Sequence, residues 1–254
     1  MVRSGAKKWI FIFGFLIISL LGPGSRSNAA AGRAVSPENK TAVVCRDAHD
    51  FVTVGIRLVH APFHFQKTEW LKAGAVAGTT GLLFLADETI RRLALNHQNT
   101  TNDALFNVDQ FYGNGITAAA VLGLYGAGYL FRNERMRLAG LHAAEAVTYA
   151  GTMTVALKIL FGRRRPYGGK SNLFFKPFQI KDVYNSLPSG HATVAFAVST
   201  VMAKSGHNPY WKIFWYSMAG MVAASRIYHN RHWASDVFLG AAIGYATGSF
   251  VMHF

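Results

Sequence analysis

The sequence predicts an all-α protein built around a membrane-embedded bundle of six helices, and three observations lead to this prediction. Half of the 254 residues are hydrophobic and only 15% are charged, below the roughly 25% typical of soluble domains. Six apolar segments recur along the chain at spacings suited to a bundle. None of them alternates with the period of two that marks a half-buried strand. We therefore expect each segment to be a helix.

The six segments occupy residues 70–86, 115–131, 139–160, 192–203, 213–224 and 237–252. They are rich in glycine and alanine, which let helices approach closely within a membrane. The third segment carries His142, Glu145 and Lys158, and polar groups inside a span usually face a bundle interior or a functional cavity. Residues 87–114 form a long polar connection, and we expect the charges there to be solvated.

The N-terminus has the order of a secretory signal. Basic residues at positions 3, 7 and 8 precede an apolar run at 9–21, helix breakers follow at 22–24, and small residues come at 27–31. The run is short for a membrane span, so we expect residues 1–31 to be an export signal or, alternatively, an uncleaved anchor. A polar arm and a short amphipathic helix at 47–66 would fill residues 32–69, and residues 70–254 would form the main domain.

The formal net charge is +14, an excess that often indicates nucleic acid or an anionic surface as partner. The sequence has no nucleic-acid motif and no aromatic stacking platform, so we expect no nucleic-acid partner. Several basic residues instead flank two short segments, and these are Lys158, Arg163, Arg164, Arg165, Arg226 and Arg231. An anionic substrate or phospholipid headgroups explain them better. The single cysteine, Cys45, excludes an internal disulfide and a zinc site of paired cysteines.

The first of three segments that could carry chemistry joins Lys158 to Arg165 and Pro166. Seven residues are two helical turns, so both cations could share one face at the end of a helix that Pro166 stops. Two neighbouring cations repel each other unless an anion lies between them. An arginine can grip two oxygens at once and a lysine acts as a point charge.

The second segment, Pro188-Ser189-Gly190-His191, directly precedes an apolar run, so we expect a helix to begin there. Ser189 offers a hydroxyl group, and Gly190 allows backbone N–H groups to approach an anion closely. A helix N-terminus is itself a favourable position for a phosphate.

The third segment contains Ser225-Arg226, then His232 and Asp236. Residues four apart on a helix share a face, so Asp236 could accept the Nδ1 proton of His232. The Nε2 atom would then be unprotonated and more nucleophilic. Arg226 adds a third cation. No carboxylate cluster suited to a metal is evident, so we expect neither a metal nor another cofactor.

Together the three segments resemble the signature of the type-2 phosphatidic acid phosphatase (PAP2) superfamily. This superfamily includes lipid phosphate phosphatases, bacterial class A acid phosphatases and vanadium haloperoxidases. Every fixed position of the signature is present with the expected spacing, and the resemblance covers roughly residues 70–254. It is highly specific for the superfamily and much less specific for the substrate. It implies a six-helix core of the PAP2 type with both catalytic histidines at one end of the bundle.

By matched position, the resemblance implies that five residues hold the phosphate oxygens: Lys158, Arg165, Ser189, Gly190 and Arg226. It implies that His232 attacks phosphorus, that Asp236 orients it, and that His191 protonates the leaving group. The expected activity is hydrolysis of a phosphate monoester or diphosphate ester of a lipid, through a phosphohistidine and without a metal. The expected location is the cell membrane after export, with the site facing the periplasm.

Three alternatives stay open at this point. A soluble periplasmic phosphatase of the class A kind would share the export signal and the motifs, but the many apolar segments favour the membrane enzyme. A vanadium haloperoxidase would hold vanadate with the same residues, although the chain is short for that group. A non-catalytic membrane scaffold would not need an intact acid, base and orienting carboxylate. The lipid could be phosphatidic acid, phosphatidylglycerol phosphate, undecaprenyl diphosphate or a lipid A phosphate.

Overall fold

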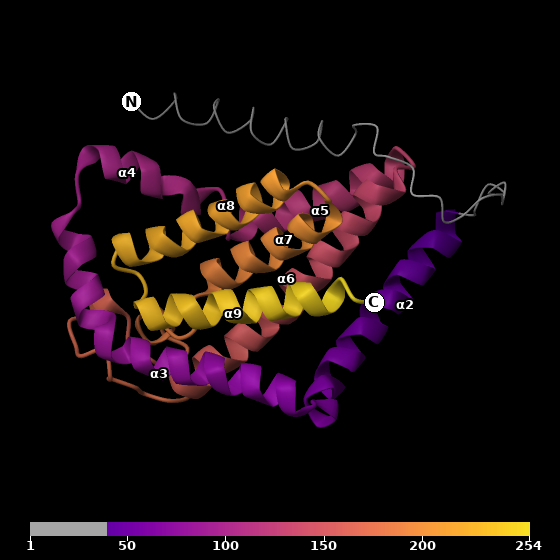
Figure 1. Cartoon of the computed structure of the whole chain (residues 1–254). Coiled ribbons are helices and arrows are strands. Elements are labelled where there is room, and N and C mark those ends of the chain that lie inside the picture. Colours follow the sequence, from indigo (N-terminus) through magenta and orange to yellow (C-terminus); the bar gives the residue numbers. More distant parts are fainter. Residues whose placement is uncertain (1–39) are drawn as a thin grey trace.

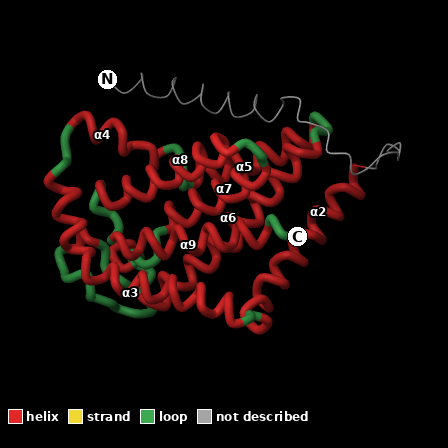
Figure 2. The backbone as a smooth tube through the Cα atoms, in the orientation of Figure 1, coloured by secondary structure: helices red, strands yellow, loops and turns green. Residues whose placement is uncertain are grey.

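The computed structural model describes residues 40–254, and its regular elements in this range are α-helices and short 3₁₀ turns (Figures 1 and 2). The predicted all-α class is therefore confirmed. The α-helices are α2 (Lys40–His60), α3 (Lys67–Asn96), α4 (Thr100–Phe106), α5 (Gly115–Leu130), α6 (Glu134–Phe161), α7 (Gly190–Ser205), α8 (Pro209–Tyr228) and α9 (Ala234–Val251). Each of the six predicted segments corresponds to one helix, in order α3 and α5 to α9, and the second and sixth segments run one residue past the helix end. The predicted export signal lies outside the described residues.

No helix between residues 40 and 254 has both the length and the apolar character that a membrane span requires. The amphipathic helix expected at 47–66 is α2, which begins earlier and ends at His60. Asp47 on α2 is buried, where it pairs with Arg137 of α6 and accepts a hydrogen bond of 2.9 Å from the hydroxyl of Tyr125. Helix α2 is therefore attached to the bundle through a buried ion pair as well as through apolar contacts.

Helix α7 lies at the centre of the bundle, packed by α6, α8 and α9 (Figure 1). Its stretch 197–203 is buried at every position, although three of those seven residues are alanine or serine. Small side chains bury little area each, so the stability of such a bundle depends on close approach of the helices. Helix α3 lies against α9, and α5 packs against α6.

Three glycines on one face of α9 allow it to approach the backbone of α7. A Cβ atom would lie 2.5 Å from the Ser189 carbonyl oxygen at Gly240 and 2.3 Å from the Thr193 oxygen at Gly244. At Gly248 it would lie 2.8 Å from the Ala197 oxygen. Any larger residue would force α9 away from α7. The contact brings the first turns of the two helices together, the part of the bundle where most of the predicted site residues lie.

Helix α6 ends earlier than expected, at Phe161, because Gly162 adopts a left-handed conformation with φ 57°. Its N–H donates to the Lys158 carbonyl at 2.8 Å. A side chain there would collide with the Lys176 carbonyl, since a Cβ would lie only 1.7 Å from its oxygen. The prediction that Pro166 stops this helix is therefore wrong. Lys158 lies in the last turn of α6, whereas Arg165 lies in the loop beyond it.

The expectation of a solvated polar connection at 87–114 is also wrong for two of its charged residues. Helix α3 continues to Asn96, and α4 and a 3₁₀ turn at Asn107–Gln110 follow. Asp87 is fully buried and Asp109 is 5% exposed. Each is buried because it pairs with an arginine, Asp87 with Arg163 and Asp109 with Arg226. A buried carboxylate without such a partner would be strongly unfavourable.

Candidate active site

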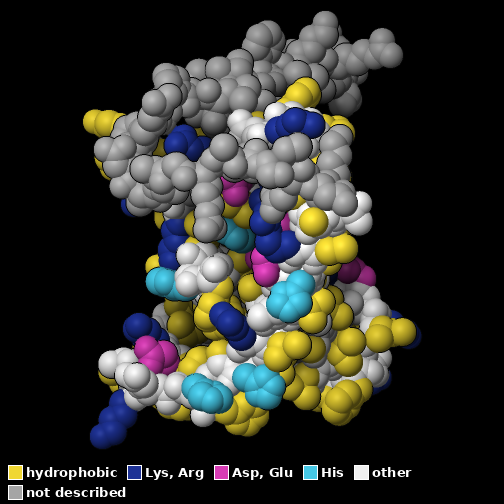
Figure 3. Space-filling model, turned by 90° about the vertical axis from the view of Figure 1, so that its right-hand side faces the viewer, with side chains coloured by type: hydrophobic (Ala, Val, Ile, Leu, Met, Phe, Trp, Pro, Cys, Tyr) yellow, Lys and Arg dark blue, Asp and Glu magenta, His cyan; other side chains and the backbone are white. Residues whose placement is uncertain are grey.

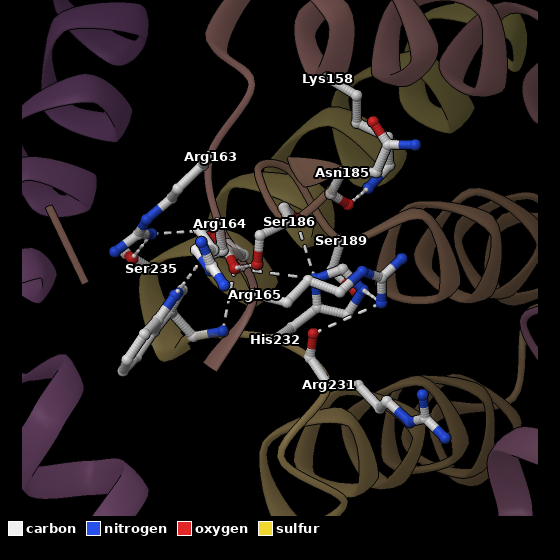
Figure 4. A network of polar contacts seen from close by, with 12 residues as sticks. Lys158, Arg163, Arg164, Arg165, Asn185, Ser186, Ser189, Arg231, His232 and Ser235 are labelled. Atoms are coloured by element: carbon white, nitrogen blue, oxygen red, sulfur yellow. Dashed lines mark hydrogen bonds and ion pairs between the residues drawn. The ribbon is translucent and has the colours of Figure 1, made fainter. Parts of the chain in front are cut away.

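The sequence-predicted residues converge at one end of the bundle, on the left in Figure 1, and Figure 4 shows Lys158, Arg165, Ser189 and His232 from close by. There α6 and α8 end, and α7 and α9 begin. The last turns of α6 and α8 carry Lys158 and Arg226, and the start of α7 carries Ser189, Gly190 and His191. Arg165 and His232 come from the loops that follow α6 and α8, and Asp236 from the first turn of α9.

The orientation of His232 is fixed by the backbone of the loop before α7. Its side chain is buried, and its Nδ1 atom lies 2.8 Å from the Ser186 carbonyl oxygen. A carbonyl can only accept a hydrogen bond, so Nδ1 carries the proton and Nε2 keeps its lone pair. The Nη1 group of Arg165, a donor, lies 3.4 Å from Nε2, which agrees with this tautomer. His232 therefore offers Nε2 as a nucleophile.

Asp236 does not accept the Nδ1 proton as expected. Its nearer carboxylate oxygen lies 3.6 Å from Nδ1 of His232, and α9 begins at Ala234, so the two residues do not share a helical face. The carboxylate instead accepts from the Trp233 N–H at 2.9 Å, from Arg163 at 2.6 Å and from the Ser186 hydroxyl. Asp236 thus acts on His232 through its charge and by holding Ser186.

The charge on Asp236 is secured by its partners. Burial alone would raise the pKa of this carboxyl group, but Arg163, together with the hydrogen bonds that the carboxylate accepts, lowers it to about 2. Asp236 is therefore an anion across the working range of pH. A fixed negative charge beside His232 would stabilise an imidazolium form of that ring.

Ser189 is the clearest candidate for a ligand-binding hydroxyl group. It is the N-cap residue of α7, yet its side chain makes no capping hydrogen bond, although capping is the usual role of serine at this position. Its Oγ atom is fully buried and has no hydrogen-bond partner among the described residues. Gly190 follows, and its missing Cβ would lie 3.9 Å from Cε of Lys158. A hydroxyl, a lysine and free N–H groups of a first helical turn are thus brought together.

Lys158 and Arg165 lie close enough to influence each other, as expected. Lys158 donates to the Asn185 carbonyl oxygen. Burial, followed by the charge of Arg165, lowers the pKa of Lys158 to about 7. This depressed pKa is the expected consequence of cations gathered with too few anions between them. An anion bound beside Lys158 would restore its charge.

Arg226 and His191 complete the site. Arg226 is 9% exposed and pairs through Nη1 with Asp109, but its Nε has no partner among the described residues. His191 is partly buried, and burial together with Arg226 lowers its pKa to about 4. Lys158 and Arg165 lower the pKa of His191 and also that of His232. The two imidazoles therefore lie in the field of the same cations.

The sequence interpretation missed a buried network beneath the site. Arg163 is fully buried and donates to Asp87 at 2.7 Å and to Asp236 at 2.6 Å. It also donates to Ser235 Oγ at 2.6 Å and to the Asn172 carbonyl at 2.9 Å. The sequence analysis grouped Arg163 with the cations expected to face the substrate. In the structure it instead pairs with two buried carboxylates. A carboxylate placed directly after an apolar segment, as Asp87 is, was the one signal that could have indicated a buried ion pair.

The residues that surround Nε2 of His232 can bind a tetrahedral oxyanion. Cationic groups come from Lys158, Arg165 and Arg226, and neutral donors come from Ser189 and the start of α7. Between residues 40 and 254 no group of three or more His, Cys, Asp or Glu side chains is arranged to hold a metal ion. Positive charge at such a site is what the equatorial oxygens of a transferring phosphoryl group require.

Comparison with known proteins relates the domain to a family. The model of the PAP2 superfamily matches residues 139–254, the range that holds all the predicted site residues. This part of the chain is therefore similar to the PAP2 superfamily. The fold class and the signature residues agree with this similarity.

Two curated relatives that match part of this chain are both named lipid A 1-phosphatase. A lipid A 1-phosphatase of Porphyromonas gingivalis is 32% identical over 169 residues, which cover 66% of this chain and 34% of that protein. A lipid A 1-phosphatase of Rhizobium etli is 30% identical over 110 residues, covering 41% and 45% respectively. The matched region thus spans less than half the length of these curated relatives.

Two crystal structures share the fold. The structure of Aquifex aeolicus LpxE has a TM-score of 0.53 at 24% identity, covering 66% of this chain and 95% of that one. A transmembrane PAP2 type phosphatidylglycerolphosphate phosphatase from Bacillus subtilis has a TM-score of 0.53 at 21% identity, covering 83% and 94%. At these identities the likeness shows a common helical architecture.

Proposed function

We propose that this protein is a phosphatase that hydrolyses a phosphate ester of a membrane lipid through a phosphohistidine on His232. One observation carries the proposal. The Nε2 atom of His232, with its lone pair free, is faced by Arg165 at 3.4 Å. Nearby, the buried Oγ of Ser189 and Nε of Arg226 have no partner among the described residues. Buried polar groups are rarely left unpaired, and a phosphate would supply the acceptors.

In the first step, the lone pair on Nε2 of His232 attacks phosphorus while the bond from phosphorus to the ester oxygen breaks. The cations and the start of α7 compensate the charge on the equatorial oxygens. His191 gives a proton to the departing oxygen. Because burial and the charge of Arg226 lower the pKa of His191 to about 4, this step requires the substrate dianion to raise it.

In the second step, His191, now neutral, accepts a proton from a water molecule whose oxygen attacks phosphorus. The bond between Nε2 and phosphorus breaks, and inorganic phosphate leaves with the histidine restored to its neutral form. Asp236 stabilises the positive ring of the intermediate through its charge. The proton that His191 gave in the first step is thus recovered in the second, and atoms and charges balance.

Exposed apolar side chains near the site support a lipid substrate. The loop between α6 and α7 exposes Leu173, Phe178 and Ile180 at 62%, 73% and 81%. Lysines at 170, 176 and 181 in the same loop are also exposed. Apolar and cationic groups in one loop suit an anionic lipid surface.

Hydrophobic side chains also gather on the face at the other end of the bundle (Figure 3). The relatives named lipid A 1-phosphatase favour a glycolipid phosphate as substrate.

The proposal is tested with purified full-length protein and a panel of phosphorylated lipids, including lipid A, phosphatidic acid and phosphatidylglycerol phosphate, with phosphate release as the readout. We expect His232→Ala to lower kcat by at least about 10³-fold, because it removes the nucleophile. His191→Ala should lower it by about 10²- to 10⁴-fold through loss of the acid. EDTA should have no effect, and ³²P-labelled substrate should label wild type but not His232→Ala.

Retained activity in His232→Ala would refute the assigned nucleophile. Release of phosphate only from soluble esters, with none from lipids, would favour the class A acid phosphatase alternative. Peroxide-dependent bromide oxidation after vanadate loading would instead support a haloperoxidase.

A further inference from the structure

Arg165 is oriented by a residue that lies outside all three signature segments. Its Nε donates to the backbone carbonyl of Asp182 at 2.9 Å, and its Nη2 donates to the Asp182 carboxylate at 2.9 Å. Two hydrogen bonds to one residue fix the plane of the guanidinium group. With Nε and Nη2 engaged on that side, Nη1 faces Nε2 of His232, 3.4 Å away, and also donates to the Arg231 carbonyl oxygen at 3.4 Å.

Asp182 is itself held in place. The hydroxyl of Tyr167 donates to its second carboxylate oxygen at 2.6 Å, so each oxygen has one defined partner. The backbone N–H of Arg165 also donates to the Val183 carbonyl at 2.8 Å, which joins the two loop segments along the main chain. The hydrogen bond from Tyr167, and then Arg165, lowers the pKa of Asp182. The carboxylate is therefore charged at neutral pH.

An arginine at this position needs such support. Lys158 and Arg226 are close enough to repel it, and an unrestrained guanidinium would turn towards solvent when no phosphate is bound. We propose that Asp182 is a positioning residue that directs Nη1 of Arg165 at the transferring phosphoryl group, with Tyr167 holding the Asp182 carboxylate. This inference rests on the proposed function. The side chain of Asp182 accepts hydrogen bonds from Arg165 and Tyr167, so its proposed effect on phosphate passes through Arg165.

If Asp182 formed only a surface ion pair, its removal would have a different effect on turnover. The Asp182 side chain is 69% exposed, and exposed ion pairs contribute little to stability. If the contact were only a surface pair, removal of the carboxylate would change neither stability nor turnover. If it positions Arg165, removal would leave stability unchanged and reduce turnover, because small displacements of a catalytic group cost up to about 10²-fold in rate.

The test compares Asp182→Ala, Asp182→Asn and Tyr167→Phe with wild type. We expect Asp182→Ala to lower kcat about 10- to 100-fold with little change in KM. Asp182→Asn should recover most of the loss, because its amide oxygen can still accept from Nη2, and Tyr167→Phe should cost only about threefold. Glu88→Gln is the matched control, since Glu88 is the half-exposed partner of Arg91 in a surface pair, and its kcat should stay within about twofold.

A double variant separates positioning from other effects. In an Arg165→Ala background, Asp182→Ala should cause no further loss, because its effect passes through the missing guanidinium. Losses that multiply, or a kcat of Asp182→Ala within about twofold of wild type, would overturn the inference.

Orthovanadate binding, measured by calorimetry, needs no turnover and so separates this inference from the proposed function. Asp182→Ala should bind vanadate about tenfold more weakly than wild type, and equal affinity would refute the positioning role. Weakened binding in a protein that releases phosphate from no ester would refute the proposed activity and leave the positioning role standing.

Discussion

Two polar clusters share this end of the bundle, and they differ in how completely their hydrogen bonds are satisfied. In the buried network, Arg163 has defined acceptors in Asp87, Asp236 and Ser235. In the site above it, Oγ of Ser189 and Nε of Arg226 lack partners among the described residues. Only one residue separates Arg163 from Arg165 in the sequence, yet the first is fully buried and the second faces His232.

The difference in hydrogen bonding distinguishes a cluster that stabilises the fold from a cluster that is suited to binding a ligand. A satisfied network of buried charges holds several elements in one arrangement, here α3, α9 and the loop after α6. Unsatisfied donors lower stability and persist where a ligand completes them. The buried network thus fixes the segments that carry Asp236 and Arg165, and the unsatisfied donors mark where an anion is expected. Three predictions follow from this contrast, in order of decreasing effect.

The largest effect should come from breaking the buried network. Asp87→Ala should lower the free energy of unfolding by about 3–5 kcal/mol, because it leaves Arg163 buried with only part of its charge compensated. Urea unfolding measures this change. The neighbouring Glu88→Ala provides a matched control on the half-exposed side of the same helix, with an expected change within about 0.5 kcal/mol. Equal stability of the two variants would contradict the structural role of the buried network.

A smaller and more selective effect should distinguish two buried serines. Ser235→Ala removes a hydroxyl that accepts from Arg163 and donates to Asp87, and should cost about 1–3 kcal/mol of stability. Ser189→Ala removes a hydroxyl without a partner among the described residues, so stability should change by less than about 0.5 kcal/mol. Its kcat should nevertheless fall by about 10²-fold. Similar stability losses in both variants would contradict the comparison.

The smallest effect should appear in the dependence of stability on pH. The pKa of Lys158 falls from its ordinary 10.5 to about 7 in the folded protein. Between these values the unfolded chain binds the proton and the folded chain does not, so this group makes stability rise with pH from about 7 to 10.5. Below pH 7 both states are protonated and the cost of the buried charge is fully present.

Thermal unfolding of wild type and Lys158→Met at pH 7 and pH 9.5 isolates this contribution. The Tm difference between the two proteins should favour wild type more at the higher pH. Saturating orthovanadate should abolish the trend, because a bound anion restores the charge of Lys158. A difference that stays constant with pH, in the absence of vanadate, would exclude a depressed pKa at this lysine.

The sequence alone determined the helical class, the six core segments and the candidate site residues that meet at one end of the bundle. These depend on local patterns, namely apolar runs without strand periodicity and a signature of fixed spacing. Local patterns failed where the outcome depended on a partner far along the chain. Asp87 and Asp109 were expected in solvent and are buried, since each pairs with an arginine more than seventy residues away.

Tertiary structure alone decided how the site residues face one another. The spacing of His232 and Asp236 suggested a direct hydrogen bond, but α9 begins between them. The backbone carbonyl of Ser186 accepts the hydrogen bond from Nδ1 instead. The support of Arg165 by Asp182 likewise has no sequence signal, because it depends on how a loop folds back. Hydrogen-bond direction is set by backbone geometry over a few ångströms, whereas residue spacing records only which groups are available.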